Sequence, residues 1–268
     1  RGSSMRLASE LAVREINAAG GVRGRQLALR IHDDSSRADV AVRVARVLYA
    51  DPRVSAVIGH LTSAATLAAS PVYNGGRSPV PVISPSASAA TVSDAGPYTF
   101  RVCPTDVLHG TRLAEFAWRR LRAQTVALLY QNDEYGRGIR ETFLSSFTRM
   151  GGSVVTDDPY ALDLPSFEPY LQRLRGRGGA DVLLIGGTAA VARRILATLD
   201  TVRLAPRVMG GDALSGLEAE PRAVGVLVSA AYLPDMPAPR NARFVEAYRR
   251  AYPGHPLDHR GAAAYDIV

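Results

Sequence analysis

Lysine is absent from this sequence, and all 32 basic residues are arginine. A chain without lysine cannot form a Schiff base through an ε-amine and cannot supply the lysine of a phosphate-binding P-loop. Cysteine occurs once, at Cys103, which excludes an internal disulfide and a multi-cysteine metal site. No apolar run approaches the ~18 residues that a membrane-spanning helix needs. These absences exclude several classes of enzyme for this chain, and they exclude a membrane-spanning helix within it.

Aromatic residues make up only 7% of the chain, and this bears on its net charge of +7. Nucleic-acid-binding surfaces usually interleave basic side chains with aromatic rings on which bases stack. Here the arginines are scattered singly, and only 118–122 and 173–178 are dense. We therefore predict solvated helix faces and no nucleic-acid partner.

The common catalytic and metal-binding motifs are also missing. GxSxG, GxGxxG and Walker sequences do not occur, and the five histidines lack metal-ligand spacing. His60 follows a glycine and is predicted to be structural, and Asp33 and Asp34 are predicted to form a solvated turn. Asp133 and Glu134 are adjacent on one loop, where two carboxylates rarely act as general acid and base. We predict no enzyme activity, no cofactor and no metal.

Amphipathic helical stretches alternate with short β-rich runs, a pattern typical of parallel sheets covered on both faces. Helices are predicted at 4–18, 37–50, 63–74, 107–121, 137–150, 167–177, 189–200 and 240–251. Strands are predicted at 26–32, 54–58, 80–83, 125–130, 153–156, 181–185, 206–209 and 225–229. The connections 100–106 and 229–239 break this rhythm. With 268 residues the chain is long enough for two α/β domains.

Small hydroxyl residues follow two of the predicted strands. Ser63 lies where the strand 54–58 gives way to a helix, so its hydroxyl and the nearby free backbone N–H groups favour an anion. Ser86 and Ser88 lie at the matching end of the strand 80–83. In open parallel sheets the ligand binds at the carboxyl ends of the strands, where neighbouring connections diverge. On the residues alone, an ordinary N-cap and an ordinary turn remain alternatives.

Five segments occur in register along nearly the whole chain. They are INAAGGVRGRQL (16–27), VIGHLTSAAT (57–66), PVISPSAS (81–88), NDEYGRG (132–138) and VMGGDAL (208–214). Together they resemble the periplasmic binding proteins for leucine, isoleucine and valine, the amino-acid receptors of bacterial ABC importers.

The resemblance implies the type I periplasmic binding protein fold, which is α/β with two Rossmann-like lobes and a ligand cleft between them. Lobe one is expected at 1–103 with an incomplete return segment at 233–268, and lobe two at 104–232. By the same resemblance, the chain is expected to be a fragment that lacks the family's first strand and its C-terminal part.

The resemblance also implies roles for the serines. Ser63 and Ser88 are expected to bind the α-carboxylate of an amino acid through hydroxyl and backbone N–H groups. Ser88 replaces the threonine that is more usual there. Ser86 is expected to offer its backbone carbonyl to the ammonium group.

Three further positions come from the other lobe. Asp212, where the family commonly has glutamate, is expected to neutralise the ammonium, although a helix N-cap is the alternative. Tyr135 is expected to cover the ligand with its ring unless it is a core aromatic. Thr188 stands where these receptors usually carry a second tyrosine, so an apolar wall is lost and leucine should not be the clear favourite.

The resemblance thus predicts an extracytoplasmic solute-binding protein that captures an amino acid or a related small zwitterion for an ABC importer by cleft closure. Its partners would be the ligand and the importer's permease, and the chain would be a monomer. It would reside in the periplasm or on the cell surface as a lipoprotein, with the signal region outside this sequence. The alternative is a ligand-sensing domain of a regulator or receptor with the same fold.

Overall fold

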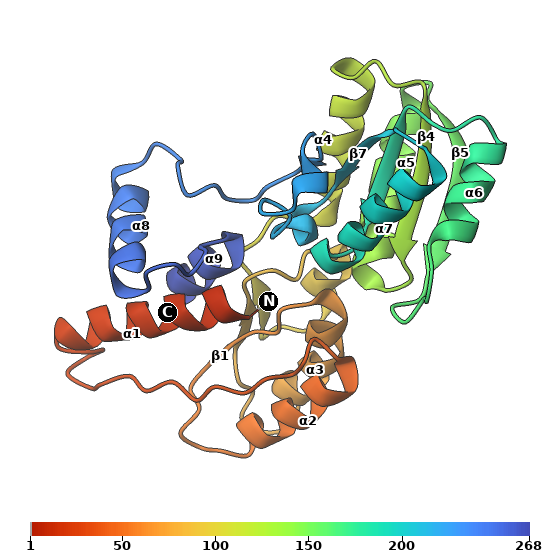
Figure 1. Cartoon of the computed structure of the whole chain (residues 1–268). Helices are drawn as coiled ribbons and strands as arrows, with labels where there is room; N and C mark the ends of the chain where they lie inside the picture. The colour runs from red at the N-terminus through yellow and green to blue at the C-terminus, as the bar shows by residue number, and fades with distance from the viewer. Residues whose placement is uncertain (1) are drawn as a thin grey trace. The chain divides into compact units, whose positions relative to one another are not determined.

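The computed structural model describes residues 2–268, which divide into two compact units (Figure 1). Unit 1 contains the residues up to Cys103 together with Ala231–Val268, and unit 2 contains Pro104–Ala230. Within residues 2–268, none of the helices combines the length and the hydropathy that a membrane span requires.

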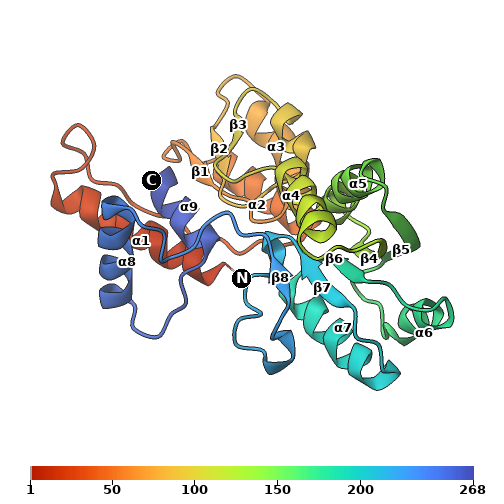
Figure 2. The same cartoon turned by 90° about the horizontal axis from the view of Figure 1, so that it is seen from above.

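Unit 2 is built on a five-stranded parallel sheet with the order β5-β4-β6-β7-β8. Its strands are β4 (Thr125–Gln131), β5 (Ser153–Tyr160), β6 (Val182–Gly186), β7 (Arg207–Gly210) and β8 (Leu227–Val228). Its helices are α4 (Asp106–Arg119), α5 (Glu134–Arg149), α6 (Glu168–Gly176) and α7 (Ala189–Val202), with short 3-10 turns η2 (Asp212–Leu214) and η3 (Pro221–Ala223). Figure 2 shows α4 and α5 on one face of this sheet and α6 and α7 on the other.

The sequence of β4 explains why both faces of this sheet are covered. Val126 and Leu128 pack with α4 and α5, whereas Ala127 and Leu129 pack with α6 and α7. Successive strand residues point to opposite faces, so an unbroken apolar run requires a layer of helices on each side.

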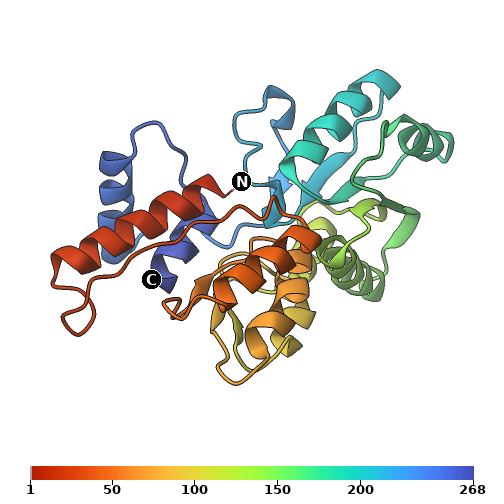
Figure 3. The same cartoon turned by 90° about the horizontal axis from the view of Figure 1, so that it is seen from below.

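Unit 1 contains a three-stranded parallel sheet, β1 (Val57–Ile58), β2 (Val82–Ser84) and β3 (Thr99–Arg101). Helices α2 (Ala38–Tyr49) and α3 (Ser63–Asn74) bury one face of it against Val57 and Val82, and η1 (Ala90–Asp94) precedes β3. A second cluster joins α1 (Ser3–Ala18), α8 (Pro239–Ala251) and α9 (His259–Ile267), which Figure 3 shows as the red helix beside the blue ones.

The predicted α/β architecture is confirmed, and every predicted helix is present to within a few residues. Two strand predictions are wrong. Residues 26–32 form no strand, because this stretch has no ladder partner within the described chain, although its pattern favours β structure. Conversely, β3 overlaps the start of 100–106, a stretch that we expected to be a connection. Phe100, at the centre of β3, is half exposed. The strand therefore lacks the alternation of buried and polar residues from which it could have been predicted.

Candidate ligand-binding site

The loops that follow β1 and β2 are joined by a hydrogen bond. Thr62 caps α3 by accepting from the Ala65 N–H at 3.2 Å, which places Ser63 in the first turn. The Ser63 hydroxyl, 2% exposed, accepts from the Ala89 N–H at 3.1 Å. The two loops predicted to meet at the sheet edge therefore form one surface in unit 1.

Ser88 completes this surface with a buried hydroxyl. Its side chain is 1% exposed, and its Oγ has no hydrogen-bond partner in the part of the chain that the structure describes. A buried hydroxyl without a partner is costly, so such groups in native proteins usually meet a ligand or an ordered water. The adjoining first turn of α3 adds backbone N–H groups that the helix itself does not use. These groups suit an anion such as a carboxylate.

Ser86 and its loop are held in place by Ser84. The Ser84 Oγ accepts from the N–H groups of Ser86 (3.3 Å) and Ala87 (2.9 Å), and it donates to the His60 carbonyl at 2.6 Å. The Ser86 hydroxyl lies 3.3 Å from the Nε2 of His259. The loop therefore has a defined conformation.

His60 has a structural role, which agrees with the sequence prediction. Its ring is 5% exposed, with Nδ1 2.7 Å from the Asp34 carboxylate and Nε2 3.1 Å from the Tyr73 hydroxyl. Both ring nitrogens are thus engaged by side chains. The prediction of a solvated turn is wrong for Asp34, because its carboxylate is partly buried against His60.

We expect the contact between Asp34 and His60 to make the stability of unit 1 depend on pH. Burial opposes ionisation of Asp34, but hydrogen bonds from His60 and from the Ser36 N–H outweigh it, so the pKa of this carboxyl is lowered. A lowered pKa stabilises the folded state above about pH 4 and loses that contribution as the pH falls through the folded-state pKa. Asp34→Asn should therefore cost about 1 to 2 kcal/mol of unfolding free energy at pH 7 and much less at pH 3. Urea unfolding followed by circular dichroism measures both values.

The matched control is Asp33→Asn, which removes the neighbouring exposed carboxylate. Within residues 2–268, Asp33 accepts only from the Ser35 N–H in its own turn, so this variant should change the unfolding free energy little at either pH. An Asp34→Asn effect of equal size at pH 3 and pH 7 would refute the assignment.

The three predicted site residues of unit 2 lie at the carboxyl ends of neighbouring strands. Tyr135 follows β4 in the first turn of α5, Thr188 follows β6, and Asp212 follows β7. The Tyr135 hydroxyl donates to the Asp212 Oδ1 at 3.4 Å and accepts from the Ala213 N–H at 3.4 Å. The structure therefore brings Tyr135 and Asp212 together.

The electrostatics around Asp212 and Tyr135 favour a cation. Asp212 is 2% exposed. Burial raises the pKa of Tyr135 well above its usual value, and the nearby carboxylates of Asp212 and Asp106 raise it further. The phenol therefore stays neutral and acts as a hydrogen-bond donor. An ammonium placed at Asp212 would gain a charge-assisted hydrogen bond in a dry environment.

Thr188 is placed differently from its two neighbours. It is the N-cap of α7, but its side chain makes no capping hydrogen bond. Its Oγ1 is buried and has no hydrogen-bond partner among residues 2–268. Thr188 thus offers a polar atom at the same sheet edge, without a hydrogen bond to Tyr135 or Asp212.

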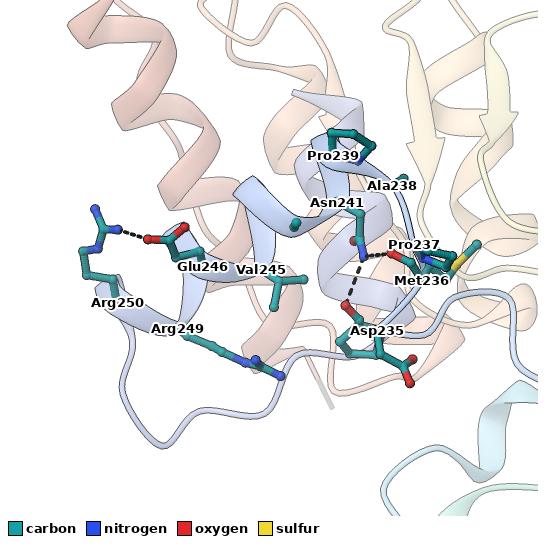
Figure 4. A pocket seen from close by; sticks show the side chains of 12 residues that line it. Asp235, Met236, Pro237, Ala238, Pro239, Asn241, Val245, Glu246, Arg249 and Arg250 are labelled. Atoms are coloured by element: carbon teal, nitrogen blue, oxygen red, sulfur yellow. Dashed lines mark hydrogen bonds and ion pairs between the residues drawn. The ribbon is translucent and has the colours of Figure 1, made fainter.

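A pocket of about 850 Å³ lies elsewhere in unit 1 (Figure 4). It is lined by the proline-rich loop before α8 and by residues along that helix as far as its last turn. Asn241 holds the loop by donating to the carbonyls of Pro234 and Met236, each at 3.0 Å. None of the six predicted site residues lines it. It contains neither the buried hydroxyls nor the carboxylate described above.

The described residues contain no group of three or more His, Cys, Asp or Glu side chains that is arranged to hold a metal. The sequence interpretation did not anticipate the contacts of Asp34 and His259. Asp34 meets His60 across 26 residues, and His259 meets Ser86 across 173 residues. No local pattern signals such pairs.

Comparison with known proteins places the chain in a family. The sequence model of the family described as "Periplasmic binding protein" matches residues 1–268. The chain is 28% identical over 202 residues to the "Amino acid binding protein" of Pseudomonas aeruginosa, covering 75% of this chain and 53% of that protein. It is 27% identical over 256 residues to the "Leu/Ile/Val-binding protein homolog 1" of Brucella suis, covering 93% of this chain and 67% of that protein.

A solved structure gives the same result. The branched-chain amino acid transporter substrate binding protein of Streptococcus pneumoniae, solved in complex with isoleucine, superposes with a TM-score of 0.89. It is 27% identical, and the match covers 99% of this chain and 76% of that one. The predicted α/β fold and the predicted membership of this family are confirmed. This chain belongs to the periplasmic binding protein family.

Proposed function

We propose that this chain captures an α-amino acid or a closely related small zwitterion outside the cytoplasm and delivers it to an ABC importer. The observation that carries the proposal is chemical complementarity. Unit 1 presents hydrogen-bond donors suited to a carboxylate, and unit 2 presents a buried carboxylate suited to an ammonium.

The carboxylate end of the ligand is assigned to Ser63, Ser88 and the first turn of α3. The orphaned Ser88 hydroxyl would gain its missing partner, and the helix N-terminus would add a favourable dipole. The Ser63 hydroxyl accepts from Ala89, so its own proton remains available for donation. A carboxylate would satisfy all of these donors together.

The ammonium end is assigned to Asp212, to the Ser86 carbonyl and to the ring of Tyr135, with Thr188 beside the ligand's side chain. Asp212 would supply the opposite charge, and a tyrosine face attracts a cation. Closure around the ligand remains part of the proposal, as the resemblance implies. The names of the relatives favour transport over a sensory role.

The remaining parts of the proposal follow from the importer role. The delivered ligand would pass to the importer's permease, and one chain would suffice for binding, so we propose a monomer. The site of action would be the periplasm or the outer cell surface, with or without a lipid anchor.

Titration calorimetry with the twenty amino acids tests the proposal. The best ligand should lose at least about 100-fold in affinity when its amine or its carboxylate is removed, since each loss leaves buried polar groups unpaired. Ser88→Ala should weaken the same ligand about 5- to 30-fold, because one hydrogen bond to a charged group is lost. Ser55→Ala, at an exposed serine of unit 1, is the control and should bind like the wild type. Equal binding of the deaminated analogue would contradict the proposal.

A further inference from the structure

Three neighbouring strands of unit 2 are preceded by segments rich in exposed arginine. Strands β4, β6 and β7 are adjacent and parallel, so the segments that lead into them from α4, α6 and α7 lie at the same edge of the sheet. These segments are 119–125, 176–182 and 202–207, and the dense arginine stretches 118–122 and 173–178 both contribute to them. Six exposed side chains form what we call the arginine edge: Arg119, Arg120, Arg122, Arg177, Arg203 and Arg207.

Hydrogen bonds from Asp181 tie the three segments together. Its carboxylate accepts from the N–H groups of Gln124 and Thr125, at 2.8 and 2.9 Å. Its carbonyl accepts from the Arg207 N–H at 2.9 Å. The arginine edge is therefore one surface on a defined backbone, although its members are far apart in the sequence.

The positive charge of this surface is not balanced by carboxylates. Asp181 is the only acidic residue in the three segments, and its carboxylate already accepts hydrogen bonds from the backbone. The nearby Asp200 pairs with Arg222 at 3.1 Å. Among residues 2–268, no carboxylate lies within ion-pair distance of the six arginines. The arginine edge thus presents a positive potential to solvent.

Local stability explains only some of these arginines. Arg119 ends α4, where a basic side chain interacts favourably with the helix dipole. Arg122 and Arg203, by contrast, have positive φ values of 57° and 55°. Glycine or asparagine is favoured in this left-handed conformation over a long side chain. At these two positions the arginine contributes its exposed charge rather than a better turn.

The chemistry of the surface fits an anionic lipid bilayer better than another macromolecule. None of the exposed large apolar side chains belongs to the three segments, whereas protein interfaces have an apolar centre. The segments also contain no aromatic residue on which nucleic-acid bases could stack. Attraction to an anionic membrane needs only basic side chains near its surface, and guanidinium groups pair well with phosphate oxygens.

We propose that the arginine edge binds the surface of an anionic phospholipid bilayer. Tyr135, Thr188 and Asp212 follow strands of the same sheet and lie at its opposite edge, away from such a bilayer. Binding would hold the protein at a membrane of the kind in which an importer's permease lies. The inference goes beyond the proposed function and does not depend on which ligand is bound.

Co-sedimentation of the 268-residue chain with lipid vesicles tests the inference. At low ionic strength, wild type should bind phosphatidylcholine vesicles that contain about 30% phosphatidylglycerol at least about 25-fold more tightly than vesicles of phosphatidylcholine alone. About 0.5 M sodium chloride should abolish this preference, because salt screens exposed charges.

A variant with four substitutions locates the effect on the arginine edge. It combines Arg120→Gln, Arg122→Asn, Arg203→Asn and Arg207→Gln, with asparagine at the two positions of positive φ. One basic side chain near an anionic surface contributes roughly 5-fold in affinity, so the variant should bind the anionic vesicles at least about 25-fold more weakly.

The matched control removes the same charge from exposed positions of unit 1. It combines Arg25→Gln, Arg46→Gln, Arg77→Gln and Arg243→Gln, and it should bind within about 3-fold of wild type. Far-UV circular dichroism establishes that each variant is folded. Equal weakening by both variants would show that net charge alone acts, and would overturn the inference.

Two measurements on wild type decide the matter even if a variant does not fold. Equal binding to vesicles with and without phosphatidylglycerol would refute the inference and leave the amino-acid proposal untouched. Displacement of the protein from anionic vesicles by polyglutamate at an equal concentration of negative charge would assign the arginine edge to an acidic protein partner instead. Retention on the vesicles supports the lipid surface.

Discussion

Replacing Asp212 by alanine is expected to weaken binding of the best amino-acid ligand by about 2 to 5 kcal/mol, roughly 30-fold to several thousand-fold. Most of this loss reflects the ammonium, which would remain buried without an opposite charge. Asp212 is 2% exposed, so little solvent could replace the carboxylate. Calorimetric titration of wild type and variant measures the difference directly.

Two further variants test whether the loss of affinity is due to the carboxylate of Asp212 itself. Tyr135→Phe removes only the hydroxyl that donates to Asp212 at 3.4 Å, so it should cost less than the loss of the carboxylate. Asp200→Ala removes a carboxylate of the same unit whose side chain is 70% exposed and paired with Arg222, and it should leave affinity unchanged. An Asp212→Ala variant that binds the ligand as tightly as wild type would eliminate Asp212 as the ammonium partner.

Replacing Phe143 by alanine should lower the unfolding free energy of unit 2 by about 3 to 5 kcal/mol. Phe143 is fully buried on α5, between that helix and the sheet, and its ring stacks on Phe147 with 5.5 Å between centroids. Its removal loses the transfer energy of a phenyl ring and leaves a cavity, which a close-packed core fills only in part.

The single tryptophan makes this effect measurable in unit 2 by itself. Trp118 packs edge-on against Phe147, with 6.0 Å between ring centroids, so its fluorescence reports on the same cluster during urea unfolding. The control is Phe116→Ala on α4, where the ring is 41% exposed and the cost should stay below about 1 kcal/mol. Equal costs for the two phenylalanines would show that this cluster does not stabilise unit 2 as we describe.

Local pattern was sufficient for the helices and for most of the strands. Amphipathic periodicity and capping residues act within a few positions, so helices such as α3 and α7 were predicted nearly to the residue. The strands of unit 2 were predictable because apolar runs between two helices require burial on both faces. A strand also needs a neighbour. Residues 26–32 have no partner strand in the described chain, whereas β3 pairs with β2. The local sequence of a segment does not reveal whether such a partner exists.

The sequence by itself determined that hydroxyl residues follow the strands of unit 1, and that Tyr135, Thr188 and Asp212 follow strands of unit 2. Only the tertiary structure decided which of these groups meet. The Asp34–His60, Tyr135–Asp212 and Ser86–His259 pairs join residues 26, 77 and 173 positions apart. Each contact depends on how separate strands and helices pack, and packing is set by the summed burial of many side chains rather than by the residues that finally touch.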